Sequence, residues 1–173
     1  MADSATTFLV SAYRDPVIVQ IKGRADYMNS QPLANFFHEM VDKGRTTFVV
    51  DFASCTTVDS TFLGILASAA IEVEDKGEGH CIVLTRLGER HLELVHNLGL
   101  DNILSLDTSG ELNYEDLQFR RAGEPIEAGQ NCSKETILKA HEALCDVDEG
   151  NVGKFQDVIA FLKNQVDGTA DRA

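Results

Sequence analysis

Residues 49–66 read Val-Val-Asp-Phe-Ala-Ser-Cys-Thr-Thr-Val-Asp-Ser-Thr-Phe-Leu-Gly-Ile-Leu, and this stretch decides the fold of the chain. An apolar β-type run ends at Asp51, a short polar connection follows, and Asp59-Ser60-Thr61 stands directly before a helical pattern. This order places Ser60 at the beginning of a helix, on the carboxyl side of a strand. A hydroxyl, a carboxylate, free backbone N–H groups and the positive end of a helix dipole are expected to meet there. Such a place tolerates a phosphoryl group that a partner protein can read.

Strands and helices are predicted to alternate on both sides of this stretch. The apolar patterns indicate strands at 7–11, 16–22, 45–51, 81–84 and 101–106. A first helix starts at Gln31-Pro32, with Ser30 or Asn29 as its cap, and further helices are expected at about 60–76 and 87–98. This alternation favours an α/β domain with a mixed sheet over residues 1–112, whose antiparallel part is the initial hairpin.

The C-terminal third of the chain has a different character. Residues 113–132 are polar and glycine-containing, and they read as a linker or an extended wrap. Residues 133–166 predict a helical hairpin, with Ser133 capping its first helix and residues 167–173 forming a tail. The hairpin should pack on the α/β domain or on a second copy, because each helix has an apolar face: Ile137, Ala140, His141 and Leu144 on the first, and Val152, Phe155, Val158, Ile159, Leu162 and Val166 on the second.

Composition excludes several classes of function. A hydrophobic fraction of 43% and a charged fraction of 25% are those of an ordinary globular protein. The formal net charge of −13 argues against binding nucleic acid or an anionic membrane, and favours a partner with a basic patch. Four scattered cysteines without a Cys-x-x-Cys spacing read as reduced residues, and with no evident signal peptide or membrane span they indicate a cytoplasmic protein. No metal-ligand motif is present, so neither a metal nor another cofactor is expected.

Three short patterns resemble the STAS family of anti-sigma factor antagonists. Asp59-Ser60-Thr61-Phe62-Leu63-Gly64 is similar to the family's Asp-Ser-(Ser/Thr)-Gly-Leu-Gly helix opening. Residues 88–101 resemble its third helix with the Gly-Leu exit, and Gly23-Arg24-Ala25-Asp26 resembles its Gly-Glu-Leu-Asp turn. The similarity spans roughly residues 5 to 112. Phe62 departs from the family's small residue, and Arg24-Ala25 departs from its acidic–apolar pair.

The resemblance implies a regulatory binding module and not an enzyme. Its partner would be a serine kinase that also acts as an anti-sigma factor, and phosphorylation of Ser60 would end binding until a separate phosphatase restores it. Thr61 is the second choice as phosphoacceptor. The expected partner-binding residues are Arg24, Asp26, Asp59, Thr61 and Phe62.

Other interpretations remain open at this point. Asp59-Ser60-Thr61 can be a simple helix cap, and Phe62 can be either a core residue or an exposed apolar anchor. A serine hydrolase would need a histidine base, yet none of His38, His80, His91, His96 and His141 has a recognisable motif spacing to Ser60. A non-switching STAS scaffold, such as a transporter or stressosome-type accessory subunit, is the main alternative. A small-molecule or nucleotide sensor lacks a phosphate loop, and self-association through the C-terminal helices is a further possibility.

Overall fold

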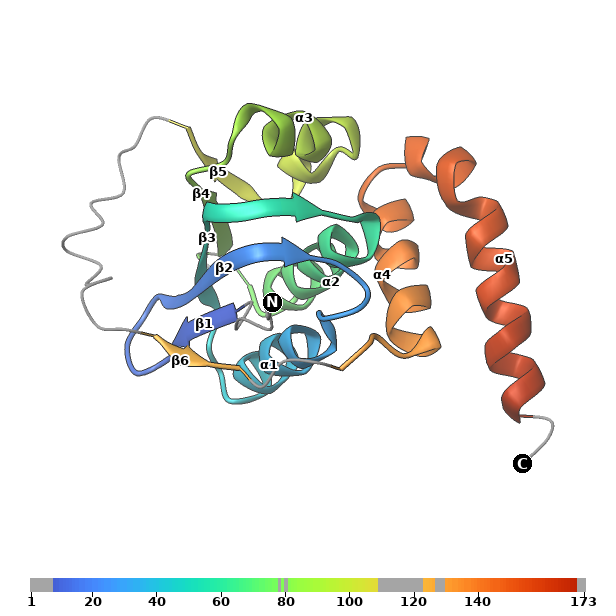
Figure 1. Ribbon diagram of the computed structural model, residues 1–173, viewed down its shortest axis with the longest axis horizontal. Coiled ribbons are helices and arrows are strands. Elements are labelled where there is room, and N and C mark those ends of the chain that lie inside the picture. Colours follow the sequence, from blue (N-terminus) through green and yellow to red (C-terminus); the bar gives the residue numbers. More distant parts are fainter. Residues whose placement is uncertain (1–7, 78, 80, 109–122, 127–129, 171–173) are drawn as a thin grey trace, which may run out of the picture.

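A computed structural model of the chain describes residues 8–77, 79, 81–108, 123–126 and 130–170. Its described strands form one sheet in the order β5-β4-β3-β2-β1-β6 (Figure 1). The strands are β1 (Phe8–Ser11), β2 (Val17–Ala25), β3 (Thr47–Val58), β4 (Cys81–Thr85), β5 (Ser105–Asp107) and β6 (Glu124–Pro125). β1 pairs antiparallel with β2 and with β6, whereas β2, β3, β4 and β5 run parallel. The expected mixed sheet with an initial hairpin is therefore confirmed.

Strand β3 continues well beyond Asp51, so the expected loop at 52–58 is wrong. The polar residues pair with an equally extended β2, from Lys22 opposite Ser54 to Ala25 opposite Val58. The acidic residue does not end the strand because the Arg86 side chain pairs with its buried carboxylate, through a 2.9 Å bond from Nε and a second contact from Nη2. A charge that is paired and hydrogen-bonded is tolerated inside a sheet.

The helices lie close to their expected positions. They are α1 (Gln31–Asp42), α2 (Ser60–Glu74), α3 (Glu89–Asn97), α4 (Lys134–Val147) and α5 (Gly150–Ala170). Ser30 occupies the N-cap position of α1 without a side-chain capping bond, while Ser133 caps α4 by accepting from the backbone N–H of Thr136 at 3.1 Å. Residues 100–102 form a short 3-10 helix, so the last parallel strand is shorter than expected. None of the described helices is both long enough and apolar enough to span a bilayer.

The chain returns to the sheet before it forms the C-terminal helices. β6 adds to the edge of β1, opposite Leu9 and Val10. The backbone N–H of Cys132 then donates to the carbonyl of Tyr27 at 2.7 Å, and that of Ser133 donates to Gln31 Oε1 at 2.9 Å. These bonds attach the start of α4 to the turn before α1. Most of the expected linker lies outside the described residues, as do residues 171–173, and α5 extends through residues 167–170 of the expected tail.

Helix α2 lies between the sheet and α4, which explains why it is buried nearly all round (Figure 1). The aromatic side chains of Phe37, Phe48, Phe52 and Phe62 fill the space around it, and Ala140, Ala143 and Leu144 of α4 belong to the same hydrophobic cluster. Gly64 permits the close approach of α4, because a Cβ atom placed there would lie 2.4 Å from the carbonyl oxygen of Ala140. The first helix of the extension is thus part of the main core.

Helix α5 packs much more lightly than α4. Leu162 is buried at 7% exposure, and Phe155 is partly buried against the core. Val152 and Val158, which the helical pattern placed on the inward face, are about half exposed, and Phe161 is 63% exposed. In Figure 1 this helix forms the outermost layer, with α4 between it and α2.

The close contact of α2 with α4 gives a direct test by substitution. Gly64→Ala should lower the free energy of unfolding by about 1–3 kcal/mol, because the added methyl group meets the backbone of α4 and not a flexible side chain. Gly153→Ala in α5 is the matched control: open space surrounds that position, and alanine should stabilise the helix by up to about 1 kcal/mol. Urea unfolding of the variants measures both effects, and equal stabilities would contradict the packing described.

Candidate functional site at the start of helix α2

The Asp59 side chain organises the turn from β3 into α2. Asp59 has an extended backbone, which places its side chain over the first turn of the helix. Its Oδ1 accepts from the backbone N–H of Phe62 at 2.9 Å, and its Oδ2 accepts from the backbone N–H of Tyr27 at 3.0 Å. One carboxylate therefore caps α2 and attaches it to the loop that precedes α1.

Burial and hydrogen bonding have opposite effects on the pKa of the Asp59 carboxyl group. Desolvation by burial raises the pKa of Asp59 above its ordinary value, and the nearby Asp26 carboxylate raises it further. The two backbone N–H bonds and His141 act in the opposite direction. Desolvation is the largest of these causes, so the protonated form of Asp59 is favoured more in the folded protein than in the unfolded chain.

The Ser60 hydroxyl is hydrogen-bonded to a histidine from the C-terminal part of the chain. Its Oγ lies 2.9 Å from Nε2 of His141, which is buried on α4. Nδ1 of the same ring lies 2.8 Å from the carbonyl oxygen of Ile137, which can only accept, so Nδ1 carries a proton. In the neutral ring Nε2 is then an acceptor, and the Ser60 hydroxyl donates to it.

Sequence reasoning placed His141 on the inward face of its helix but did not connect it with Ser60. The two residues are 81 positions apart, and no local motif links them. The sequence does contain one indication of such a contact: His141 stands among the apolar side chains of α4, and a buried histidine needs polar partners.

Two expected partner-binding residues lie inside the protein. The interpretation of Phe62 as an exposed anchor is wrong: its ring is 0% exposed, stacked on Phe8 with centroids 6.3 Å apart and edge-on to Phe52 at 6.2 Å. Thr61 is also buried. The first turn of α2 faces the core on that side, so the alternative reading of Phe62 as a core residue is confirmed.

Arg24 and Asp26 do lie at the surface turn beside the site. Nε of Arg24 is 3.5 Å from Oδ2 of Asp26, and Oδ1 of Asp26 accepts from the backbone N–H of Met28 at 2.9 Å. The backbone N–H of Asp59 donates to the carbonyl of Ala25 at 3.3 Å. The turn and the start of α2 therefore form one continuous polar edge.

A cavity of about 490 Å³ opens beside Ser60, between α2, α3 and α5. Its wall is mainly apolar, with a few polar groups near the hydroxyl. The lining residues are Val58, Asp59, Ser60, Leu63, Leu94, Asn97, Leu98, Lys154 and Phe155. Any molecule that approaches Ser60 through this opening meets apolar side chains, one carboxyl group and one lysine.

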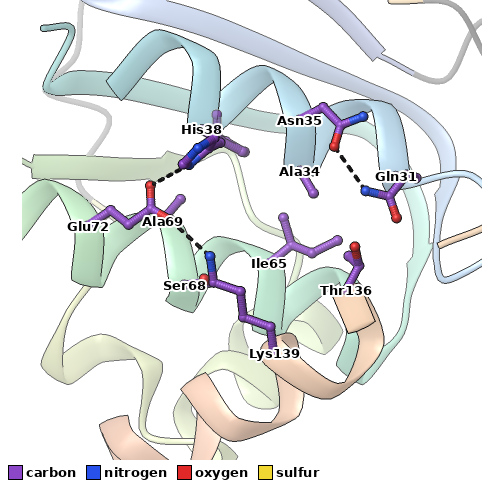
Figure 2. A pocket seen from close by; sticks show the side chains of 11 residues that line it. Gln31, Ala34, Asn35, His38, Ile65, Ser68, Ala69, Glu72, Thr136 and Lys139 are labelled. Carbon is purple, nitrogen blue, oxygen red and sulfur yellow. Dashed lines mark hydrogen bonds and ion pairs between the residues drawn. The ribbon is translucent and has the colours of Figure 1, made fainter. Parts of the chain in front are cut away.

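A second cavity, of about 200 Å³, lies between α1, α2 and α4 and is separate from Ser60 (Figure 2). The Glu72 carboxylate pairs there with His38 at 3.5 Å and with Lys139 at 3.2 Å. Because these charged groups pair with one another, this cavity has a structural explanation as the seam between three helices.

Two of the described cysteines have thiols of low reactivity. Burial raises the pKa of Cys55 and of Cys132 to about 11, so both thiols are protonated at neutral pH and are weak nucleophiles. Within the described ranges, no three histidine, cysteine, aspartate or glutamate side chains gather as a metal site.

A mixed sheet with an N-terminal hairpin, and a helix capped by Asp59 that begins at Ser60 after the central strand, are the features expected of a STAS domain. The family model described as "Mlab, STAS domain" matches residues 8–106, which is more than half of the chain. The chain therefore belongs to the STAS domain family. Helices α4 and α5, including His141, lie beyond the matched residues.

Solved structures of anti-sigma factor antagonists have the same fold. The unphosphorylated form of SpoIIAA is 14% identical with a TM-score of 0.52, over 65% of this chain and 96% of that one. The phosphorylated form of SpoIIAA, from Bacillus, is 16% identical with a TM-score of 0.51, over 66% and 99%. A Thermotoga maritima protein assigned as an anti-sigma factor antagonist is 21% identical with a TM-score of 0.54, over 66% and 95%. Comparison with curated proteins finds no match.

The raised pKa of Asp59 predicts a pH dependence of stability. The native state holds the Asp59 proton more tightly than the unfolded chain does, so the wild type should gain stability relative to Asp59→Asn as the pH falls from neutral toward 3.8. Urea unfolding of both proteins over this range measures the difference. Asp157→Asn, at an exposed position of α5, controls for the loss of one negative charge, and a wild type that loses stability relative to Asp59→Asn over this range would contradict the prediction.

Proposed function

We propose that the protein is an anti-sigma factor antagonist-like binding module whose switch is the phosphorylation of Ser60. The partner is a serine kinase that also acts as an anti-sigma factor, and a phosphatase removes the phosphoryl group. The observation that carries the proposal is the position of Ser60: it follows the capping Asp59 at the start of α2 in a STAS domain and lines an open cavity. The likeness to SpoIIAA, which is known in unphosphorylated and phosphorylated forms, supports it.

Charge is the physical basis of the proposed switch. A phosphoryl group adds about −1.5 to −2 charges at neutral pH. The positive end of the α2 dipole tolerates this charge within the protein. In a complex, the same charge is removed from water next to Asp59 and Asp26, and an interface built for a neutral hydroxyl loses affinity. The net charge of −13 favours a partner surface with basic residues.

The proposed function requires no catalysis by this chain. The Ser60–His141 bond has the donor and acceptor roles of a nucleophile and its base, but in this proposal the hydroxyl receives a phosphoryl group from the partner kinase. The regulated protein needs no cofactor, and its proposed place is the cytoplasm, where kinase and sigma factor act.

A second candidate is a non-switching STAS scaffold, such as a transporter or stressosome-type accessory subunit. One observation favours it: the Ser60 hydroxyl is already engaged by a histidine of the same chain. In that case Ser60 serves as a structural contact and the protein stays unmodified.

Phosphorylation mapping separates these two candidates. Incubation with ATP and each purified anti-sigma-type serine kinase of the source organism should add one phosphate, seen by intact mass, and peptide mapping should place it on Ser60. Ser60→Ala should remain unmodified. A phosphate found only on Thr56, Thr57 or the C-terminal helices would exclude Ser60 as the switch, and no modification by any kinase would favour the scaffold.

The charge switch also predicts a difference between two types of substitution. Ser60→Ala should retain affinity for the kinase, whereas Ser60→Glu should weaken it about tenfold or more, since an unpaired charge would be desolvated at the interface. Titration calorimetry with the kinase that modifies Ser60 measures both. Equal affinities for the two variants would rule out a switch based on charge.

A further inference from the structure

Helix α5 forms one wall of the cavity beside Ser60 and narrows the approach to the hydroxyl. Two residues from its second turn, Lys154 and Phe155, form one side of the cavity beside the hydroxyl. The ring of Phe155 packs edge-on against the ring of His141, with centroids 5.1 Å apart. The hydroxyl, its histidine acceptor and the aromatic ring above them therefore follow one another from α2 through α4 to α5.

The start of α5 is attached by hydrogen bonds from its side chains to backbone carbonyl groups at the ends of α3 and α4. The fully buried amide of Asn151 donates from Nδ2 to the carbonyl of Leu98 at 2.9 Å and to that of Leu144 at 2.8 Å. Nζ of Lys154 donates to the carbonyl of Asn97 at 2.7 Å. Because the last carbonyl groups of a helix lack partners within it and carry partial negative charge, the end of α3 favours an amide or a cation here.

The rest of α5 makes few buried contacts. Leu162 is buried, but Phe161 and Val158 point largely to solvent. In α4, by contrast, Ala140, Ala143 and Leu144 are inside the main core. Segments with little buried apolar area open at lower free energy than core segments, so α5 is expected to open at lower free energy than α4.

We propose that α5 is an intramolecular occupant of the docking surface around Ser60, and that a partner reaches Ser60 by displacing it. The expected partner is a helical protein segment that presents the same side chains to this surface as Asn151, Lys154 and Phe155 do. It would carry a side-chain amide and, about one helical turn later, a lysine followed by an aromatic residue. The inference rests on the proposed role of Ser60 as the regulated hydroxyl.

The surface that α5 would uncover supports this partner chemistry. Its apolar floor is formed by Leu63, Leu94 and Leu98, which require an apolar or aromatic side chain above them. Its polar groups are the carbonyls at the end of α3 and the Asp59 carboxyl, all of them hydrogen-bond acceptors when Asp59 is ionised. A basic–aromatic segment matches both, and it also complements the net charge of −13.

Displacement of α5 leaves the Ser60–His141 pair intact, because His141 belongs to α4. The Nδ1–H of His141 stays bonded to Ile137 of the same helix. A partner that lifts α5 thus meets a hydroxyl whose proton already points to an acceptor, without unfolding the core.

Thiol labelling measures this opening without any kinase. Ser60→Cys places a thiol at the site, and its alkylation by iodoacetamide is followed by peptide mass spectrometry. Adding Asn151→Ala removes the two hydrogen bonds that the Asn151 side-chain amide donates to Leu98 and Leu144. Alkylation at position 60 should therefore accelerate about tenfold or more. Adding Asn164→Ala, the same substitution at an exposed position of the same helix, should leave the rate unchanged.

The native thiol of Cys132 serves as an internal control for global unfolding, because it is buried and precedes α4. If the Asn151→Ala protein is labelled at Cys132 and position 60 together, Lys154→Gln takes its place as the test variant. The exposed Lys154 side chain donates to the carbonyl of Asn97 at 2.7 Å and to Asn151 Oδ1 at 3.4 Å, so its loss weakens the attachment of α5 without opening the core. Faster labelling at position 60 alone is the expected result with either variant. An unchanged rate at position 60 with both would overturn the proposal, whether or not Ser60 proves to be phosphorylated.

A synthetic peptide tests the partner chemistry. Added to the Ser60→Cys, Asn151→Ala protein, a peptide of residues 149–166 should slow alkylation at position 60 again by occupying the uncovered surface. The same peptide with Phe155→Ala and Lys154→Glu should not. Equal protection by the two peptides, or none by either, would overturn the assignment of a basic–aromatic partner.

Discussion

The burial of helix α2 on both sides is the constraint on which the rest of the structure depends. One side meets the sheet through Phe62, whose ring packs on Phe8 of β1 and Phe52 of β3. The other side meets α4 so closely that a side chain at position 64 would collide with the α4 backbone. Because Ser60 begins this helix, the element that packs on α2 also decides what surrounds the hydroxyl. In this chain that element is α4, which brings His141 to 2.9 Å from it.

The polar bonds around the site connect segments that lie far apart in the sequence. Asp59 joins the start of α2 to the turn before α1, Cys132 joins that turn to the start of α4, and Asn151 joins α4 to the end of α3. Each bond satisfies a backbone group at a helix end or a turn, where the helix itself offers no partner. In this chain the extension thereby places residues of α4 and α5 next to Ser60.

Much of the fold could be predicted because local signals agreed with one another. Asp59 and Ser133 stand before helical patterns and do cap the helices that follow them, and the apolar run at 81–84 does form a central strand. The errors came where a distant residue overrides a local signal. The sequence pattern ends the strand at Asp51, but in the structure the strand continues because Arg86 pairs with this carboxylate. The sequence pattern left Phe62 equally open to an exposed or a buried position, and the structure buries it between Phe8 and Phe52.

By itself, the sequence determined the mixed α/β fold, the place of Ser60 at a helix start and the apolar faces of the C-terminal helices, since capping, periodicity and turn residues act over a few positions along the chain. The STAS family was indicated by the resemblance of three short motifs. Only the tertiary structure decided that the Ser60 hydroxyl lies within hydrogen-bonding distance of His141, that Phe62 and Thr61 are buried, and that α4 enters the core while α5 stays at the surface. These features depend on contacts between residues that are tens of positions apart. Such contacts are set by how closely whole helices approach, which no short stretch of sequence records.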